Sequence, residues 1–388
     1  MGDFPRIAII GGGPGGLTLA RLLHVQGITA TVFESDAGPD ARIQGGSLDL
    51  HTDSGLAALE AAGLMAAFAR VARPEDQGIR LYDRSGVCVL DDGDDAHAGR
   101  PEIDRGQLRD LLLSALPPKC LQWEARVQKI EPLPGDRFRL HAQHGVAGDF
   151  DLIIGAEGTW SKTRALLTDE APAYTGVSFV GMQVTDVDRD HPDLAAMVGR
   201  GKIFALADSK ALIAQRNSGG KLHVYVAVWT PETGLSSFDP SDPRAARASL
   251  IGQLDGWTPQ LLAFIHAAVD ITAARPIYAF DPPLRWPHRR GVTLLGDAAH
   301  VMSPFAGEGV NNAMLDALHL ARAIVSDDWR AGIRAYEAEM FERIPPSAAA
   351  SASNMAAFLA PAGLANALAI FQGHTRGQKL VIATATPT

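Results

Sequence analysis

The chain has 388 residues, which is enough for more than one domain, and its formal net charge is −9 with no dense block of Lys or Arg. These features argue against nucleic acid or an anionic membrane as the main partner. Cys88 and Cys120 are too few for a disulfide framework and fit a reducing compartment. No uninterrupted apolar run reaches the roughly 18 residues of a membrane span, and the first residues leave no room for a signal peptide. We therefore expect a cytoplasmic protein, with no membrane or nucleic-acid partner, that acts as a monomer.

The amino-terminal segment has the spacing of a dinucleotide-binding turn. Residues 6–10 predict a short buried strand, residues 17–27 a helix, and residues 28–33 a second strand that ends in Glu34. The glycines of the G-x-G-x-x-G between strand and helix are Gly11, Gly13 and Gly16. A glycine pattern that follows a strand, opens a helix and precedes an acid by about twenty residues is typical of a Rossmann-like nucleotide site.

Each residue of this pattern has a physical task. Gly11 permits the tight turn, Gly13 lets a pyrophosphate approach the backbone, and Gly16 lets the helix pack closely on the strand. Glu34 would accept a hydrogen bond from a ribose hydroxyl and would repel a 2′-phosphate, so the pocket favours FAD or NAD over NADP. The alternative is a glycine-rich turn that binds no ligand.

A second glycine-containing segment lies almost a whole chain away. Residues 292–295 predict a buried strand that delivers Asp297 to its carboxyl end, where ligands of open α/β sheets bind. The residues that then lead into a predicted helix over 310–324 are Gly307, Gly309, Val310 and Asn311. Backbone N–H groups at such a helix start favour partial negative charge, and Asp297 beside them is placed to accept hydrogen bonds from a polyol. The alternative is a turn glycine, an exposed Asp and an ordinary helix start.

Polar residues between these two segments are further ligand candidates. Arg42 is interpreted as a contact for a phosphate or a nicotinamide cofactor, with a solvated surface position equally open. Asp49 is interpreted as a ligand contact or as the cap of a helix over 54–69. Arg105 begins a predicted helix, where a cation opposes the helix dipole, and this mismatch indicates a bound anion. Arg109 is interpreted as a surface residue.

A second strand–glycine turn follows residues 150–154. This predicted strand runs into Gly155 and Gly158 and then Arg164, and the turn is placed to bring backbone and the arginine near a dinucleotide. It lacks the third glycine of the fingerprint, so we do not count it as a second cofactor site.

Residues 172–275 are predicted to form a second domain of a different kind. The runs predicted as strands are 176–184, 202–207, 211–215 and 222–229. They indicate an antiparallel sheet, a wall for a substrate pocket, followed by helices over 243–254 and 259–268. Residues 329–344 predict another helix, stopped by Pro345 and Pro346.

The pairing of GGGPGG (11–16) with GDAAHVMSPFAGEGVNNAMLDAL (296–318) resembles the single-component FAD-dependent aromatic hydroxylases. Over most of the chain the sequence is most similar to the tetracycline-inactivating flavin monooxygenases. This likeness includes ARIQGGSLDLH (41–51), EIDRGQLR (102–109) and LHVYV (222–226). The resemblance implies a resident FAD, transient NADPH or NADH, dioxygen, and an aromatic or polyketide substrate.

The resemblance also assigns site residues. It implies that Glu34, Arg105 and Asp297 hold FAD, that Asp49 lies nearby, and that Arg42 contacts NADPH. The residues that it places on the substrate side are Gln183, His223, Pro304 and Phe305. The expected cofactor-binding residues also include the glycines of the first turn and the residues at the second helix start, namely Gly11, Gly13, Gly16, Gly307, Gly309, Val310 and Asn311.

The implied fold is α/β, with a Rossmann-like FAD-binding domain, a second α+β substrate domain built on an antiparallel sheet, and a C-terminal bridging helix. The predicted FAD-binding domain is discontinuous and comprises residues 1–73, 99–171 and 276–325. The predicted substrate-binding domain comprises 74–98 and 172–275. A C-terminal helical segment over 326–373 and a poorly ordered tail over 374–388 complete the chain.

Two positions depart from the family pattern. Glu157-Gly158 stands where the aromatic hydroxylases usually carry Asp-Gly after a strand such as 150–154. The tetracycline enzymes have an arginine near the position of Ala211, where only Lys210 is close. The sequence therefore leaves the identity of the substrate open.

The expected activity is a monooxygenase reaction that hydroxylates a polycyclic or aromatic molecule, including a tetracycline as one candidate (antibiotic inactivation), through a flavin hydroperoxide. The flavin carries this chemistry, so we expect no catalytic acid–base residue, and the 12 histidines show no metal-ligand spacing. One alternative is a flavin reductase or dehydrogenase without oxygen insertion. Another is a non-catalytic protein that binds FAD or a polyketide. A membrane-associated epoxidase is disfavoured, because Pro361, Gly363 and Asn366 interrupt the apolar run near the C-terminus.

Overall fold

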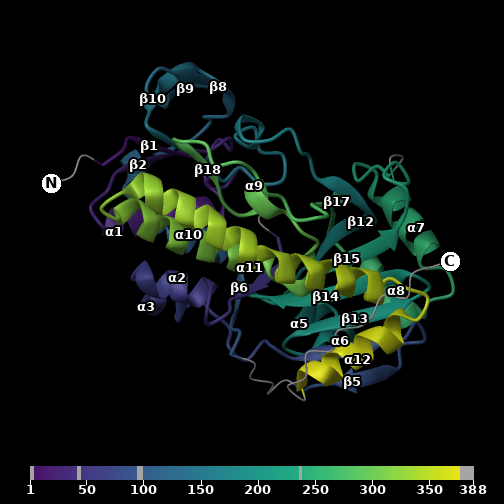
Figure 1. The fold of residues 1–388 in the computed structure, drawn as a ribbon. Helices are drawn as coiled ribbons and strands as arrows, with labels where there is room; N and C mark the ends of the chain where they lie inside the picture. The colour runs from purple at the N-terminus through teal and green to yellow at the C-terminus, as the bar shows by residue number, and fades with distance from the viewer. Residues whose placement is uncertain (1–3, 42–44, 94–98, 236–237, 376–388) are drawn as a thin grey trace. The chain divides into compact units, whose positions relative to one another are not determined.

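The computed structural model describes residues 4–41, 45–93, 99–235 and 238–375, which are drawn in colour in Figure 1. The chain forms two compact units. Unit 1 comprises Met1–Ala72, Ile103–Ala173 and Tyr278–Ala348, and unit 2 comprises Arg73–Glu102, Tyr174–Ile277 and Ala349–Thr388. Arg42 and residues 376–388 of the predicted tail lie outside the described residues.

Unit 1 is built on a parallel sheet with the strand order β18-β11-β1-β2-β7. These strands are β1 (Ile7–Ile10), β2 (Ala30–Phe33), β7 (Leu121–Gln122), β11 (Leu152–Gly155) and β18 (Val292–Leu294). Neighbouring strands pair in parallel, for example Ile9 with Ile154 and with Val32. The apolar runs that predicted buried strands therefore assemble into one sheet, and the Rossmann-like part of the predicted fold is confirmed.

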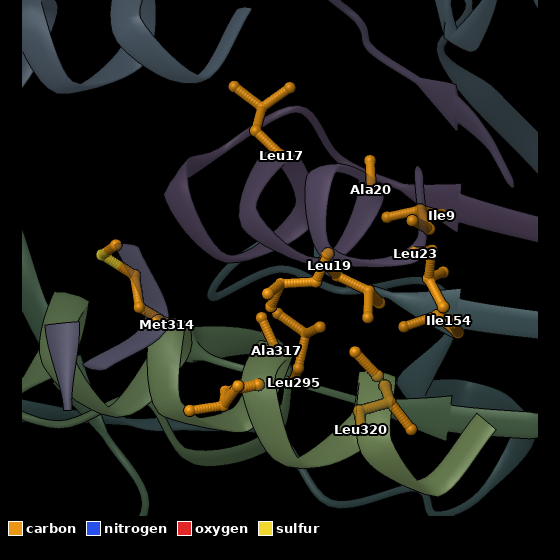
Figure 2. Packing of buried hydrophobic residues seen from close by; sticks show 14 of the residues in the cluster. Ile9, Leu17, Leu19, Ala20, Leu23, Ile154, Leu295, Met314, Ala317 and Leu320 are labelled. Atoms are coloured by element: carbon orange, nitrogen blue, oxygen red, sulfur yellow. The ribbon is translucent and has the colours of Figure 1, made fainter. Parts of the chain in front are cut away.

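Two helices pack together beside this sheet, namely α1 (Pro14–Val25) and α10 (Gly309–Val325). Figure 2 shows Leu19 and Leu23 of α1 facing Ala317 and Leu320 of α10, and all four are fully buried in one apolar cluster. Each leucine buried in this way stabilises the fold by about 1.5–3 kcal/mol. This packing holds the two helix starts, and the loops that lead into them, at the same edge of the sheet.

The remaining elements of unit 1 surround this core. The helices are α2 (Gly55–Ala61), α3 (Met65–Phe68), α4 (Arg105–Ser114) and α9 (Asp297–His300), with short 3₁₀ turns η1 (Pro118–Cys120), η2 (Arg164–Leu166) and η3 (Pro304–Ala306). The strands are β3 (Ser47–Asp49), β6 (Glu102–Asp104), β8 (Val127–Leu133), β9 (Arg137–Ala142) and β10 (Gly145–Phe150). The single helix predicted over 54–69 was wrong. The chain breaks it at Gly63, whose φ of 70° no α-helix contains.

Unit 2 contains a mainly antiparallel sheet with the strand order β16-β12-β15-β14-β13-β4-β5, and β17 also pairs with β12. The strands are β4 (Ile79–Tyr82), β5 (Cys88–Asp91), β12 (Ala173–Val184), β13 (Lys202–Ala207), β14 (Lys210–Asn217), β15 (Lys221–Trp229), β16 (Asp270–Ile271) and β17 (Arg275–Ala279). Its helices are α5 (Val187–Asp190), α6 (Pro192–Val198), α7 (Pro243–Gln253), α8 (Pro259–His266) and α12 (Gly363–Thr375). The predicted antiparallel sheet is confirmed.

One face of this sheet forms the core of unit 2. Met182, Val224 and Ala214 point to it from neighbouring strands and are almost fully buried with Leu250 and Phe264 of the helices α7 and α8. On the opposite face, the alternate residues Gln183, Gln215 and His223 are half-buried, whereas Val177, Ala211 and Ala227 further along the same strands are buried.

Helix α11 (Trp329–Phe358) does not stop at the two prolines, so this prediction was wrong. A proline within a helix has no N–H to donate to the carbonyl four residues earlier. For Pro345 that carbonyl belongs to Phe341, and Arg285 donates a hydrogen bond to it at 2.9 Å. A side chain distant in sequence therefore satisfies the carbonyl oxygen that the proline leaves without its usual partner. In the described parts of the chain, every helix is too short or too polar to span a lipid bilayer.

Candidate functional site

The glycine turn after β1 is shaped by backbone crowding on one side and is open on the other. Gly11 has φ of 110°, and a Cβ there would lie 2.3 Å from the carbonyl oxygen of Ala156. A Cβ on Gly16 would lie 2.1 Å from the carbonyl oxygen of Gly11, so only glycine permits this approach of helix to strand. A Cβ on Gly13 would meet no atom within 4 Å. The surface in front of Gly13 is therefore accessible to a ligand, as the expected approach of a pyrophosphate requires.

Glu34 lies at the end of β2 and is buried against this turn. Its Oε2 accepts a hydrogen bond from the backbone N–H of Gly12 at 2.7 Å, and its Oε1 accepts from the N–H of Asp36 at 2.9 Å and the hydroxyl of Ser35 at 3.0 Å. The carboxylate thus joins the glycine turn to the loop after β2. Because Oε2 accepts only one of these bonds, it retains a further lone-pair site for the proposed ribose contact.

The amino-terminal turn and the distant Gly296 segment meet in the structure. A Cβ on Gly15 of α1 would lie 2.7 Å from Leu295 and 3.1 Å from the carbonyl oxygen of Ala313 in α10. A Cβ on Gly296 would lie 3.0 Å from the Cβ of Ala313. Small residues on all three segments therefore allow the starts of α1 and α10 to approach each other, although about 280 residues separate them in the sequence.

Asp297 follows β18 at the carboxyl edge of the parallel sheet. Its side chain is accessible to solvent, yet so much protein surrounds it that desolvation raises its pKa, against the opposing charges of His300 and Arg105. The electrostatic interaction places Arg105, the first residue of α4, in the neighbourhood of this carboxylate. A Cβ on Gly309 would lie 3.9 Å from Asp297 Oδ1, so the carboxylate also borders the start of α10.

The start of α10 is fixed by the amide of Asn311, which is fully buried. Its Oδ1 accepts hydrogen bonds from the backbone N–H of His51 at 2.9 Å and of Gly55 at 3.3 Å, and its Nδ2 donates to the carbonyl of Asp49 at 2.8 Å. The side chain is therefore occupied within the protein, and a contact with a cofactor would use backbone N–H groups at this helix start. The N–H groups of Gly309, Val310 and Asn311 precede the first bond of the helix, from Asn312 N–H to the carbonyl of Glu308.

Asp49 and Gly307 lie beside the same helix start. A Cβ on Gly307, whose φ is 69°, would lie 3.3 Å from Asp49 Oδ1. The other carboxylate oxygen of Asp49 lies 3.3 Å from Nε2 of His51. Asp49, the last residue of β3, thus borders the start of α10. It does not cap α2, whose start has no side-chain cap.

A buried charged network beneath the Gly296–Asp297 turn was missed by the sequence analysis. Asp316 of α10 is fully buried and accepts hydrogen bonds from the backbone N–H of Gly296 at 2.8 Å and from His300 Nε2 at 2.6 Å, and it also pairs with Arg343 of α11. Burial raises its pKa, but His300, Arg343 and the Gly296 N–H outweigh burial, and the pKa is lowered overall. An acid within an otherwise apolar helix face was the available signal, because Asp is almost never fully buried unless paired.

Arg109 and Arg164, both considered in the sequence analysis, are buried and paired within the protein. Arg109 was predicted to lie on the surface, and this was wrong: it is buried and forms an ion pair with Asp36 at 3.0 Å. Arg164 is also buried and donates to the carbonyl oxygens of Ala298 at 3.1 Å and Thr159 at 2.8 Å. Both arginines connect loops at the carboxyl edge of the sheet. Arg109 contacts the segment after β2, and Arg164 contacts the segments after β11 and β18.

Glu157, at the departure from the family's Asp-Gly pair, turns into the protein. Its Oε1 accepts hydrogen bonds from the backbone N–H of Thr163 at 2.8 Å and from the Thr163 hydroxyl at 2.7 Å. Its Oε2 is buried and has no hydrogen-bond partner among the described residues, and burial raises the pKa of the carboxyl group. The backbone N of the same residue would lie 2.8 Å from a Cβ on Gly11, so Glu157 borders the glycine turn through its main chain.

The substrate-side candidates lie in both units. In unit 2, Gln183 of β12 and His223 of β15 are directly opposite each other on the half-buried face of the sheet, and the His223 ring lies 4.6 Å from that of Tyr225 between centroids. In unit 1, Pro304 and Phe305 form the short turn η3 that leads to Gly307. Pro304 is exposed and Phe305 is half-buried.

Comparison with known proteins gives four likenesses over most of the chain. Residues 5–127 and 140–332 match the family described as FAD binding domain. The monooxygenase asqM of Emericella nidulans is 31% identical over 375 residues, which cover 83% of this chain and 84% of the relative. HpxO of Klebsiella pneumoniae, solved with FAD and uric acid, has a TM-score of 0.78 at 22% identity and covers 96% of this chain and 93% of its own. The tetracycline destructase Tet(51) has a TM-score of 0.71 at 17% identity over 99% of this chain and 100% of its own, and both structures are similar to this chain in fold.

Proposed function

Because this chain belongs to the FAD binding domain family of flavoprotein monooxygenases, we propose that it hydroxylates a polycyclic or aromatic small molecule at the expense of NAD(P)H. The predicted fold, family and resident FAD are thereby confirmed. One oxygen atom of dioxygen would enter the substrate and the other would leave as water, with two electrons and a proton from NAD(P)H and a proton from solvent completing the balance. The observation that carries this proposal is the meeting of the Gly11–Gly16 turn with the Gly296–Asp297 segment.

The residues of unit 1 fit an FAD molecule. The open surface in front of Gly13 and the N–H groups at the start of α1 suit the pyrophosphate, and Glu34 suits the ribose. Asp297, with Arg105 and Asp49 in its surroundings, would hold the part of the cofactor towards the flavin, together with the N–H groups of Gly309 and Val310. Bound FAD supplies the chemistry of taking electrons from NAD(P)H and activating dioxygen.

The protein's own task is then to bind, orient and exclude water. Gln183 and His223 would contact the substrate with hydrogen-bonding groups, while Pro304 and Phe305 would contribute apolar surface. Arg42 remains proposed as an NADPH contact, although it lies outside the described residues. Tet(51) supports a tetracycline as one substrate to test, and HpxO, whose structure holds uric acid, supports a smaller heterocycle.

The decisive experiment uses the FAD-loaded protein under ¹⁸O₂. NADPH and NADH oxidation is followed with tetracyclines, other polyketides and hydroxylated aromatic heterocycles, and products are analysed by mass spectrometry. Substrate-stimulated NAD(P)H oxidation with one ¹⁸O in the product supports the proposal. NAD(P)H oxidation with every substrate left unchanged would identify a flavin reductase instead. Binding of FAD or polyketide without any stimulated oxidation would identify a non-catalytic binding protein.

Two coarser expectations complete the proposal. Cys88 is exposed and Cys120 is buried, and both are free thiols, which supports a reducing compartment such as the cytoplasm. We propose a monomer, which size-exclusion chromatography with light scattering would test.

A further inference from the structure

The half-buried face of the unit 2 sheet carries a row of polar side chains, one from each of four adjacent strands. Strand register places Gln183 of β12 opposite His223 of β15, His223 opposite Gln215 of β14, and Gln215 opposite Lys202 of β13. Residues directly opposite each other in a sheet point to the same face. We call these four residues the polar row.

One end of the polar row is tied to a buried carboxylate. Glu102 is 2% exposed, and it accepts hydrogen bonds from Lys202 Nζ at 3.1 Å and from Gln215 Nε2 at 3.2 Å. Its backbone is fixed by reciprocal hydrogen bonds with Arg73 at 2.8 and 3.2 Å. Glu102 therefore neutralises Lys202, and it also sets the direction of the Gln215 amide. Because Nε2 of Gln215 points to Glu102, its Oε1 is turned away from the carboxylate as an acceptor.

The chain segments that pack over this face add aromatic surface and no formal charge. Phe204, two residues along β13 from Lys202, contacts Phe358 and Phe371 at ring-centroid distances of 5.8 and 5.6 Å. Residues 349–375, which provide those two rings, contain no Asp, Glu, Lys or Arg. Two further charged residues in register with this face, Asp270 beside Gln183 and Lys221 at the start of β15, are exposed and are of opposite sign.

We propose that the polar row selects aromatic substrates without an ionised carboxylate, and that Glu102 is the positioning residue that sets this preference. The inference rests on the proposed function, in which Gln183 and His223 face the substrate. A carboxylate on the row would lose its hydration and would find Lys202 already paired with the buried anion, so it would gain no new ion pair. A neutral phenol or carboxamide loses far less hydration on reaching the same surface.

The test compares two ligands of closely matched shape and different charge, 1-hydroxy-2-naphthamide and 1-hydroxy-2-naphthoate, by calorimetric titration of the FAD-loaded protein. We expect the native protein to bind the amide at least about tenfold more tightly than the acid, a difference of about 1.4 kcal/mol. In Glu102→Gln, Lys202 keeps a hydrogen-bond acceptor but loses its counter-charge. The acid should then bind about tenfold more tightly than to native protein, with the amide changed less than about threefold.

Two further variants separate charge from shape. In the double variant Glu102→Gln with Lys202→Gln the row is again neutral, and the native preference for the amide should return. Asp149→Asn removes a carboxylate from an ion pair with Arg139 in the small sheet of unit 1, and it should leave both affinities unchanged. Thermal unfolding with circular dichroism verifies that each variant is folded.

Equal or tighter binding of the acid by native protein would overturn the inference, as would the absence of any binding of the amide. A preference that stays unchanged in Glu102→Gln would overturn the role of Glu102. Because binding is measured without NAD(P)H, failure of the proposed monooxygenase activity would appear separately, as a preserved binding preference with no oxygen incorporation.

Discussion

Asp316, in the second turn of α10, accepts a hydrogen bond at 2.8 Å from the backbone N–H of Gly296, the residue immediately before Asp297. Gly296 has φ of 59°, so the chain makes a sharp turn at this point. His300 Nε2 binds the same oxygen, Oδ2, and Arg343 pairs with the other oxygen, Oδ1. A buried, paired carboxylate therefore fixes the direction in which Asp297 leaves the sheet, and we expect it to affect cofactor binding although it lies beneath the candidate site.

Asp316→Asn should weaken FAD binding by about tenfold or more, since the neutral amide loses the ion pair with Arg343 and has one acceptor oxygen for donors that now share two. The FAD-free protein should also unfold at lower temperature, because Arg343 would remain partly buried without its counter-charge. FAD affinity is measured by quenching of flavin fluorescence. Asp110→Asn, at an exposed position of α4, provides the control and should match native protein. An Asp316→Asn variant with native affinity would show that the turn keeps its shape without the carboxylate.

Two glycines of one motif should respond to alanine in opposite ways. A methyl group on Gly16 would overlap the carbonyl oxygen of Gly11, whereas one on Gly13 would meet no protein atom, and φ of −78° at Gly13 suits alanine. Gly16→Ala should therefore destabilise the FAD-free protein by about 1–3 kcal/mol or more. Gly13→Ala should leave the unfolding of FAD-free protein unchanged and weaken only FAD binding. Denaturant unfolding with and without FAD separates the two effects, and equal loss of stability in both variants would contradict this assignment.

Glu157 predicts a pH-dependent contribution to stability. Burial raises its pKa in the folded protein above the ordinary value of 4.5. The folded state therefore retains this proton at a pH where the unfolded chain has lost it, and the native free energy of unfolding falls as pH rises from about 4.5 to the folded-state pKa. Glu157→Gln removes this ionisation. Its stability relative to native protein should rise over the same pH window in urea titrations, and a difference independent of pH would show that Glu157 is not the group responsible.

Local sequence patterns predicted the parts of the fold that depend on local structure. The runs that became β1, β11 and β18 are short and apolar on both faces, as parallel strands buried beneath helices must be. Strand β13 has the predicted bounds, because β-prone residues end at the turn formed by Asp208 and Ser209, both with positive φ. The Gly11–Gly16 turn was predictable for the same reason, since its spacing encodes a backbone conformation.

What the sequence could not predict depends on partners far along the chain. Arg109 has the character of a surface residue until Asp36 is placed beside it. Pro345 predicts the end of a helix until Arg285 is placed at the carbonyl of Phe341. Asp316 is an acid on an apolar face of α10 until His300 and Arg343 are placed beside it. In each case a charged side chain satisfies a group that local periodicity leaves unsatisfied, and no local pattern contains this information.

Asp297 should show opposite effects on stability and on cofactor binding. Its raised pKa means that the surrounding protein disfavours the ionised carboxylate in the absence of FAD, although His300 and Arg105 oppose this effect. At neutral pH Asp297→Asn removes that cost, so FAD-free protein should unfold at the same or a higher temperature than native protein. The same variant loses a charged acceptor for the polyol of the cofactor, a contact worth about 1.5–3 kcal/mol, and FAD affinity should fall by about tenfold to a hundredfold. Asp297→Ala, which lacks any acceptor, should bind FAD more weakly still.

Fluorescence titration of FAD binding and thermal unfolding of the FAD-free protein measure the two effects of Asp297 independently. If Asp297→Asn binds FAD as tightly as native protein, Asp297 does not contact the cofactor. If the FAD-free variant unfolds at a lower temperature than native protein, Asp297 stabilises the fold, contrary to this prediction.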